Sequence, residues 1–147
     1  GLLPILRSIT NTVHVKEYKG KKVAVDTYVW LHKASYSCSS DLCQGIPTDK
    51  YVDYCMHRVK LLQHFGVIPV LVFDGDTLPA KKHTEASRFK SRMEHKQKGL
   101  ECLAAGNDKE AREHFQKAVE ISPDVAYRLI TRLMAEGIEF IVSPYEA

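Results

Sequence analysis

The sequence predicts an α/β protein, with a parallel sheet covered by helices on both faces, in one domain of 147 residues. Three short apolar runs, at residues 23–25, 68–73 and 138–142, are rich in Val, Ile, Leu and Phe. Long stretches with helical periodicity separate these runs. Near-continuous apolar runs that alternate with helices are typical of a parallel sheet buried on both faces.

The helices in the first half of the chain are predicted from their caps and breakers. The apolar residues 1–6 are expected to form an amphipathic first helix, and residues 28–42 can form another after the first strand. Thr48 and Asp49 indicate the start of a third helix, which Gly66 ends, so its length is about 17 residues by these boundaries.

Three further helices are predicted between the second and third strands. Pro79 can open a helix that carries many basic residues and breaks at residues 106–108, before another helix at 109–121. Ser122 as the N-cap, with a proline at the first helical position, predicts the start of the last helix, and Gly137 marks its end. No low-complexity linker divides the chain.

Composition excludes several classes of protein. The longest apolar stretch, residues 67–73, is far shorter than the ~20 residues that a membrane-spanning helix needs. The apolar opening segment lacks the basic and small-residue flanks of a signal peptide. The four cysteines show neither a C-x-x-C pair nor the spacing of a structural zinc site, so we expect reduced thiols and a cytosolic or nuclear protein.

The charge is unevenly distributed, although the net charge is only +3. Residues 81–98 contain seven Lys or Arg and two Glu, whereas the rest of the chain has 14 basic and 16 acidic residues. One basic segment on a slightly acidic body indicates a local binding site for an anion.

An acid follows each predicted strand, at Asp26, Asp74 and Glu146. The carboxyl ends of parallel strands meet at one edge of a sheet, where ligands of α/β proteins usually bind. Three carboxylates gathered there would repel one another unless a cation neutralised them, and Mg²⁺ or Mn²⁺ suits oxygen ligands better than zinc does. Each aspartate also has an ordinary alternative, as a helix cap or turn residue, which the pattern alone leaves open.

The residues around these acids resemble motifs of the XPG-type structure-specific 5′ nucleases. The stretches are VAVDTYVWLHK at 23–33, VFDG at 72–75 and PYEA at 144–147, and the likeness runs in order along essentially the whole chain. It is closest to the exonuclease branch of that family. The resemblance implies a PIN-like nuclease core over residues 1–147, with a basic helical arch and cap inserted at about residues 79–122.

The resemblance also implies an activity and its cofactor. It implies a Mg²⁺-dependent 5′→3′ exonuclease that acts on double-stranded DNA and also cleaves 5′ flaps, in nuclear DNA repair and recombination. Asp26, Asp74 and Glu146 match acids that bind two Mg²⁺ ions, for which Mn²⁺ can substitute. Two-metal hydrolysis needs no side-chain nucleophile, in agreement with the lack of a convincing Ser-His-Asp or Cys-His arrangement. The implied partners are duplex DNA with 5′ ends, nicks, gaps or flaps, and mismatch-repair proteins that bind regions outside this chain.

Four cations of the basic segment share one face if that segment is helical, namely Lys81, Arg88, Arg92 and Lys96. Such a stripe can follow a phosphate backbone. Taken alone, such a run is more often a solvated helix face, with Glu85 and Glu94 as surface partners. The resemblance implies catalytic roles for Lys81 and Arg88, which would stabilise charge on the scissile phosphate, and contacts to DNA for Arg92 and Lys96.

Two residues after the first strand are further candidates for contacts to DNA. Tyr28 can stack on a base beside the metal site, since stacking tolerates every base. The resemblance implies that His32, one helical turn later, props open bent duplex DNA. Their ordinary alternatives are a core aromatic residue and a half-buried polar residue.

Two rival functions remain open at this point. Residues 99–123 are similar to a tetratricopeptide hairpin, which would indicate a protein-binding module, but a solenoid needs about three repeats and no second copy is present. A PIN-like ribonuclease would use a similar acid cluster on a similar sheet. Because the chain lacks an initial Met and stops soon after Glu146, we expect it to be a fragment that is weakly active or inactive alone.

Overall fold

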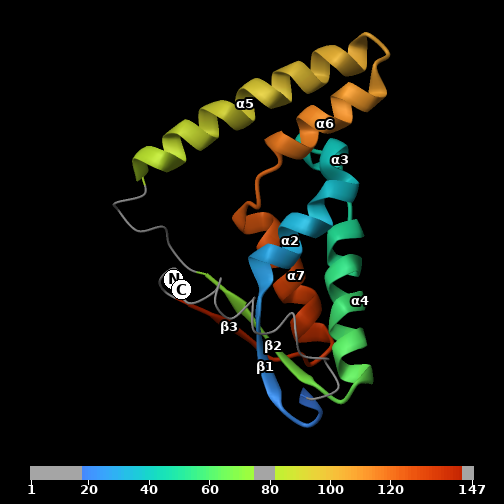
Figure 1. Cartoon of the computed structure of the whole chain (residues 1–147), viewed down its shortest axis with the longest axis vertical. Helices are drawn as coiled ribbons and strands as arrows, with labels where there is room; N and C mark the ends of the chain where they lie inside the picture. Colours follow the sequence, from blue (N-terminus) through green and yellow to red (C-terminus); the bar gives the residue numbers. More distant parts are fainter. Residues whose placement is uncertain (1–17, 75–81, 144–147) are drawn as a thin grey trace.

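The computed structural model describes residues 18–74 and 82–143 of the chain (Figure 1). The amphipathic first helix expected at residues 1–6 therefore lies outside the described residues. The described elements, in chain order, are β1 (Lys22–Asp26), α2 (Thr27–Ser35), the 3₁₀ helix η2 (Tyr36–Cys38), α3 (Ser39–Cys43), α4 (Lys50–His64), β2 (Ile68–Phe73), α5 (Lys82–Ala104), α6 (Asp108–Ala118), α7 (Pro123–Ala135) and β3 (Phe140–Val142).

The three strands form the predicted parallel sheet, in the order β1-β2-β3. Val25 of β1 pairs with Leu71 of β2, and Leu71 pairs in turn with Phe140 of β3. All three strands point the same way, so their carboxyl ends reach the same edge of the sheet (Figure 1). The α/β class and the parallel sheet predicted from the three apolar runs are confirmed.

One hydrophobic core joins the sheet to α2, α4 and α7. Val25, Leu71 and Phe73 alternate along β1 and β2, so they lie on a single face of the sheet. They pack with buried residues of the three helices, which include Leu31, Ala34, Val52, Cys55, Val59, Leu129 and Leu133. The second covering layer that the sequence predicts is not defined by the described residues.

The single helix expected at residues 28–42 is divided in the structure into α2, η2 and α3. The hydroxyl of Ser35 donates to the carbonyl of His32 at 2.8 Å, and that of Ser37 donates to Ala34 at 3.0 Å. Serine hydroxyls that bond to nearby carbonyls weaken regular helix geometry. The tighter turn places Cys38 in the sheet core and Cys43 in a second cluster beside α6.

The predicted boundaries of the last helix are confirmed within two residues. The hydroxyl of Ser122 accepts a hydrogen bond from the backbone N–H of Val125 at 3.4 Å, which caps the start of α7. Gly137 has a positive φ of 69°, which suits the residue that ends a helix. The third strand begins later than predicted, at Phe140, because Ile138 still donates to Leu133 at the end of α7.

The basic helix α5 folds back on α6 as a hairpin that extends beyond α3, away from the sheet (Figure 1). Its own small cluster contains Ala111 and Phe115 of α6 together with Cys43 of α3. Gly99 permits the close approach of the two helices, because an added Cβ would lie 2.7 Å from the Phe115 ring. Among the described residues, no helix is long and apolar enough to span a membrane.

The four cysteines are free in the structure, and Cys102 is the most exposed of them. Cys55 is fully buried between α4 and the sheet, and this burial raises the pKa of its thiol to about 12. The Cys55 thiol is therefore a core side chain without reactive character.

Replacing Gly99 by alanine tests the packing of the hairpin. Alanine alone favours a helix over glycine by up to about 1 kcal/mol. Phe115 is buried and cannot swing away, so we expect the overpacking to dominate and to lower the free energy of unfolding by about 1–3 kcal/mol. Urea or thermal unfolding measures the change.

Two further variants serve as controls for this substitution. Ser91→Ala, on an exposed part of the same helix, should change stability by less than about 0.5 kcal/mol. Phe115→Leu combined with Gly99→Ala should show a favourable coupling energy, because the smaller side chain relieves the contact. A Gly99→Ala protein more stable than the wild type would contradict the predicted close packing.

Candidate functional site

Two of the three predicted acids lie together at the carboxyl edge of the sheet. Asp26 is the last residue of β1 and pairs with Val72 of β2, and Asp74 follows two residues after Val72. Side chains alternate along a strand, so Asp26 and Asp74 fall on the opposite side from the buried Val25 and Phe73. Both aspartates are half-buried. The sheet therefore holds the two carboxylates near each other on neighbouring strands.

The third predicted acid, Glu146, lies outside the described residues. The described part of the chain ends just after β3, where Val142 pairs with Phe73 and the N–H of Ser143 donates to the carbonyl of Phe73 at 2.8 Å. β3 therefore ends at the edge of the sheet that carries Asp26 and Asp74.

The chemistry of this donor set fits a hard divalent cation. Asp26 and Asp74 offer only carboxylate oxygens, which Mg²⁺ and Mn²⁺ prefer, whereas zinc favours Cys and His. Two acids are too few to complete a site. Within residues 18–74 and 82–143, no group of three or more His, Cys, Asp or Glu side chains is placed to hold a metal ion.

Tyr28, in the first turn of α2, links the core to this edge. Its ring meets Phe73 edge to face, with 6.2 Å between centroids. Burial raises the pKa of the Tyr28 hydroxyl, and the negative charge of Asp74 raises it further. Tyr28 therefore lies close enough to Asp74 to respond to its charge.

His32 lies one turn further along α2, between charges of opposite sign. Partial burial lowers the pKa of its imidazole, the carboxylate of Asp26 acts in the opposite direction, and the guanidinium of Arg92 lowers the pKa further. The structure therefore brings His32, Asp26 and the α5 residue Arg92 into one electrostatic neighbourhood.

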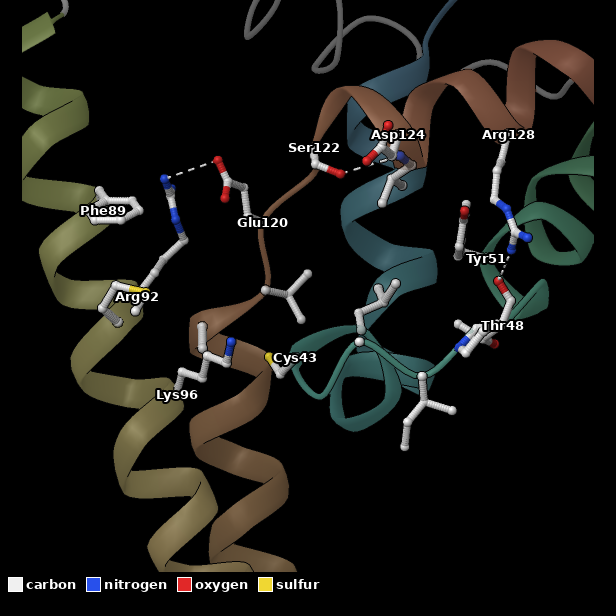
Figure 2. Close-up of a pocket in the computed structure, with 18 residues that line it drawn as sticks. Cys43, Thr48, Tyr51, Phe89, Arg92, Lys96, Glu120, Ser122, Asp124 and Arg128 are labelled. Carbon is white, nitrogen blue, oxygen red and sulfur yellow. Dashed lines mark hydrogen bonds and ion pairs between the residues drawn. The ribbon is translucent and has the colours of Figure 1, made fainter.

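The side chain of Arg92 turns from α5 toward the body of the protein (Figure 2). Its Nη2 lies 3.6 Å from Oε1 of Glu120, in the segment that joins α6 to α7, and only 22% of the Arg92 side chain is exposed. Its Nε is buried, with no hydrogen-bond partner in the described part of the protein. A buried guanidinium donor without a partner is costly, and the packing of the Arg92 side chain and its ion pair with Glu120 must offset that cost.

A cavity of about 400 Å³ lies beside Arg92, between α5 and the body of the protein (Figure 2). Phe89, Met93 and Lys96 of α5 line one side, and the opposite side is formed by the loop before α4, the connection before α7 and the first turns of both helices. Lys96 lies near the buried Cys43 and lowers the pKa of that thiol, against the dominant raising effect of burial.

The cations of the predicted basic stripe differ in their exposure to solvent. The spacing places Arg88, Arg92 and Lys96 along one side of α5 as predicted, but only Arg88 is exposed. Arg92 and Lys96 face the cavity instead of open solvent. Lys81 lies outside the described residues. The roles in catalysis and DNA contact predicted for these cations remain predictions.

Glu120 is a partner of Arg92 that the sequence did not predict. Glu85 and Glu94 were the expected surface partners for the cations of α5, because they lie on the same helix. The partner of Arg92 comes from the far end of the hairpin instead. No local sequence pattern marks Glu120, since the contact forms only when α6 folds back against α5.

The chain is similar to known proteins along its whole length. The model of the XPG N-terminal domain matches residues 1–95. Over all 147 residues the chain is 52% identical to exonuclease 1 of Arabidopsis thaliana and 45% identical to exodeoxyribonuclease 1 of Saccharomyces cerevisiae, covering 20% and 21% of those proteins. The solved catalytic core of Rad2 in complex with DNA substrate shares the fold, with a TM-score of 0.53 and 21% identity over 92% of this chain and 35% of that one.

Because Arg92 is largely buried and Lys90 is exposed, we expect truncation of Arg92 to lower stability more than truncation of Lys90 does. Arg92→Ala should lower the free energy of unfolding by about 1 kcal/mol, because the apolar stem loses its packing as well as its ion pair. Lys90→Ala, at an exposed position of the same helix, should change it by less than about 0.5 kcal/mol. Chemical unfolding at low and high salt measures both. Equal effects of the two substitutions would contradict the burial of Arg92.

Proposed function

Because this chain belongs to the XPG N-terminal domain family, we propose that it supplies part of the active site of a Mg²⁺-dependent 5′ nuclease that hydrolyses DNA. The observation that carries the proposal is the placement of Asp26 and Asp74 at one edge of a parallel sheet. The chain spans about a fifth of the length of the curated relatives that it matches. The proposed activity is accordingly that of the whole protein.

The relatives support DNA as the substrate. Two of them bear the names exonuclease 1 and exodeoxyribonuclease 1, and the Rad2 core was solved with a DNA substrate. We propose that the whole protein degrades double-stranded DNA from 5′ ends, nicks and gaps in the 5′→3′ direction, and also removes 5′ flaps. This activity would be that of a nuclear enzyme of DNA repair, including mismatch repair, and of recombination.

The acids at the strand ends are proposed to bind the metal ions. Asp26, Asp74 and the predicted Glu146 would hold two Mg²⁺ ions, or Mn²⁺ in their place. When bound, such ions activate the attacking water and stabilise the leaving 3′ oxygen. The chain contributes fixed carboxylates, since β1 and β2 hold the backbone of Asp26 and Asp74 in register. Rigid positioning of this kind avoids reorganisation during the reaction.

The cations and aromatic residues would then act on the DNA. Arg88 and Lys81 would stabilise negative charge on the scissile phosphate, and Tyr28 would stack on a base beside the acids. Tyr28 has the geometry for this role, because its ring is anchored edge to face on Phe73 while its hydroxyl lies near Asp74. His32 would contact the duplex at the neighbouring turn of α2.

Arg92 and Lys96 require a more specific proposal, because both face the cavity under α5. To bind Arg92, DNA would have to displace Glu120. The ion pair of Arg92 with Glu120 would then be replaced by one with a DNA phosphate. In the alternative, Arg92 orients α5 and affects DNA only through the position of Arg88 and its neighbours.

The rival functions fit the structure less well. The tetratricopeptide-like hairpin exists as α5 and α6, but these helices pack on α3 through Phe115 and Cys43, and the described residues contain no second such hairpin. A PIN-like ribonuclease would share the sheet. The family and the names of the relatives favour DNA over RNA.

Removing one carboxylate tests the proposed site. In the full-length protein, Asp74→Ala should lower the rate of Mg²⁺-dependent cleavage of 5′-recessed duplex DNA by about three orders of magnitude, because several kcal/mol of charge stabilisation are lost. DNA binding, measured by fluorescence anisotropy, should change by less than about threefold, since phosphate contacts elsewhere dominate affinity.

A matched control and a second substrate accompany this experiment. Asp53→Ala on α4 removes an exposed aspartate that pairs with Arg132 of α7, and it should leave cleavage within about twofold of the wild type. Single-stranded RNA should be a much poorer substrate than 5′-recessed DNA. Cleavage at the wild-type rate by the Asp74→Ala protein would refute the metal site, and faster cleavage of RNA would favour the ribonuclease.

A further inference from the structure

Two histidines face each other across the hairpin of α5 and α6. Nδ1 of His95 lies 3.1 Å from Nδ1 of His114, and the two ring centroids are 5.4 Å apart with an angle of 31° between the ring planes. Both side chains are half-buried, so solvent reaches them. The pair is remote in sequence from the strand-end acids, and the proposed nuclease chemistry does not use it.

We propose that His95 and His114 form a binding site for a divalent transition ion, with Zn²⁺ as the expected occupant. Each histidine would contribute its Nδ1 atom, and water would complete the coordination shell. The ion would connect α5 to α6 directly. This site is independent of the proposed nuclease activity.

The separation of the two nitrogens suits a shared ion. Two ligand atoms at about 2.0–2.1 Å from a tetrahedral zinc ion are about 3.3–3.4 Å apart, and right-angle geometry brings them to about 2.9 Å. The observed distance of 3.1 Å lies between these values. The centroid distance of 5.4 Å shows that the two Nδ1 atoms now point at each other. Each ring must therefore turn by about 40° to direct its lone pair at a shared ion about 2.0–2.1 Å away.

The protonation states also suit metal binding. A hydrogen bond between the two Nδ1 atoms requires that one of them carries a proton and the other does not. Binding requires that proton to move to Nε2, or to be released, which contact with solvent permits. Partial burial lowers the pKa of His95, and the charges of Lys117, His114 and Lys98 lower it further, against an opposing effect of Glu94. Neutral imidazole, the ligand form, is thereby favoured at neutral pH.

The charges around the pair select against weakly binding ions. Lys98 and Lys117 repel any cation, and Glu94 offsets part of that repulsion. All three side chains are exposed, so water and salt screen these effects. Coordination by imidazole overcomes such screened repulsion for Zn²⁺ or Cu²⁺, but Mg²⁺ prefers oxygen ligands and gains little from two nitrogens. The carboxylates of Asp26 and Asp74 at the strand ends suit Mg²⁺ better than Zn²⁺.

Zinc titration of the chain tests this site directly. ZnCl₂ is added to metal-stripped protein at neutral pH in the presence of excess Mg²⁺, which occupies carboxylate sites, and binding is followed by calorimetry. We expect one zinc ion per chain. His95→Gln and His114→Gln should each weaken binding by at least about tenfold, because either change removes one of two protein ligands. His57→Gln, which alters an exposed histidine on α4, should bind as the wild type does.

A spectroscopic measurement on the unaltered chain covers the case in which a variant folds poorly. One equivalent of Cu²⁺ should give an electron paramagnetic resonance spectrum with couplings to imidazole nitrogens. Circular dichroism checks the folding of each variant. The proposal is overturned if the wild type binds no zinc, if both histidine variants bind zinc as the wild type does, or if the copper spectrum shows oxygen ligands alone.

Discussion

The parallel pairing of β1, β2 and β3 is the constraint on which the rest of the structure depends. It brings Asp26 and Asp74 to one edge, although many residues separate them in the chain. The core formed with α2, α4 and α7 fixes this register, because a shift of one residue would expose Val25, Leu71 and Phe73. Burial of these side chains therefore also positions two carboxylates whose mutual repulsion would otherwise separate them.

Charges of alternating sign connect this edge to the helical hairpin. Asp26 acts on His32, His32 also responds to Arg92, and Arg92 pairs with Glu120 at the far end of α6. The hairpin is fixed to the body by a second cluster of its own, built on Phe115 and Cys43. The position of α5 relative to the acids thus depends on packing at α3 and on the partly buried ion pair of Arg92 with Glu120. A helix held in this way suits the contacts to DNA phosphates that are proposed for the basic segment.

Local signals in the sequence were sufficient for those parts of the fold that depend on local physics. The bounds of β2 were predicted correctly because residues 68–73 are continuously apolar, and α7 was located from Ser122, which caps it as expected. The prediction of a single helix at 28–42 was wrong. Serine hydroxyls bond to nearby carbonyls there, and Cys38 and Cys43 pack into two different clusters, so the helix is interrupted. The site shows the same contrast between local and long-range signals. The positions of Asp26 and Asp74 could be predicted from the direction of the strands alone. The contact of Arg92 with Glu120 could not be predicted, because it forms only in the folded hairpin.

The central claim is that the sheet edge at Asp26 and Asp74 binds a divalent cation, and paramagnetic line broadening tests it most directly. Substoichiometric Mn²⁺ added to the ¹⁵N-labelled chain should first broaden the amide signals of Asp26, Thr27 and Asp74. Signals of Lys22 and Ile68, about 13 Å or more away at the opposite ends of the strands, should persist, and excess Mg²⁺ should reverse the broadening. Uniform broadening, or broadening that begins at other acids such as Asp49 and Asp53, would contradict the account.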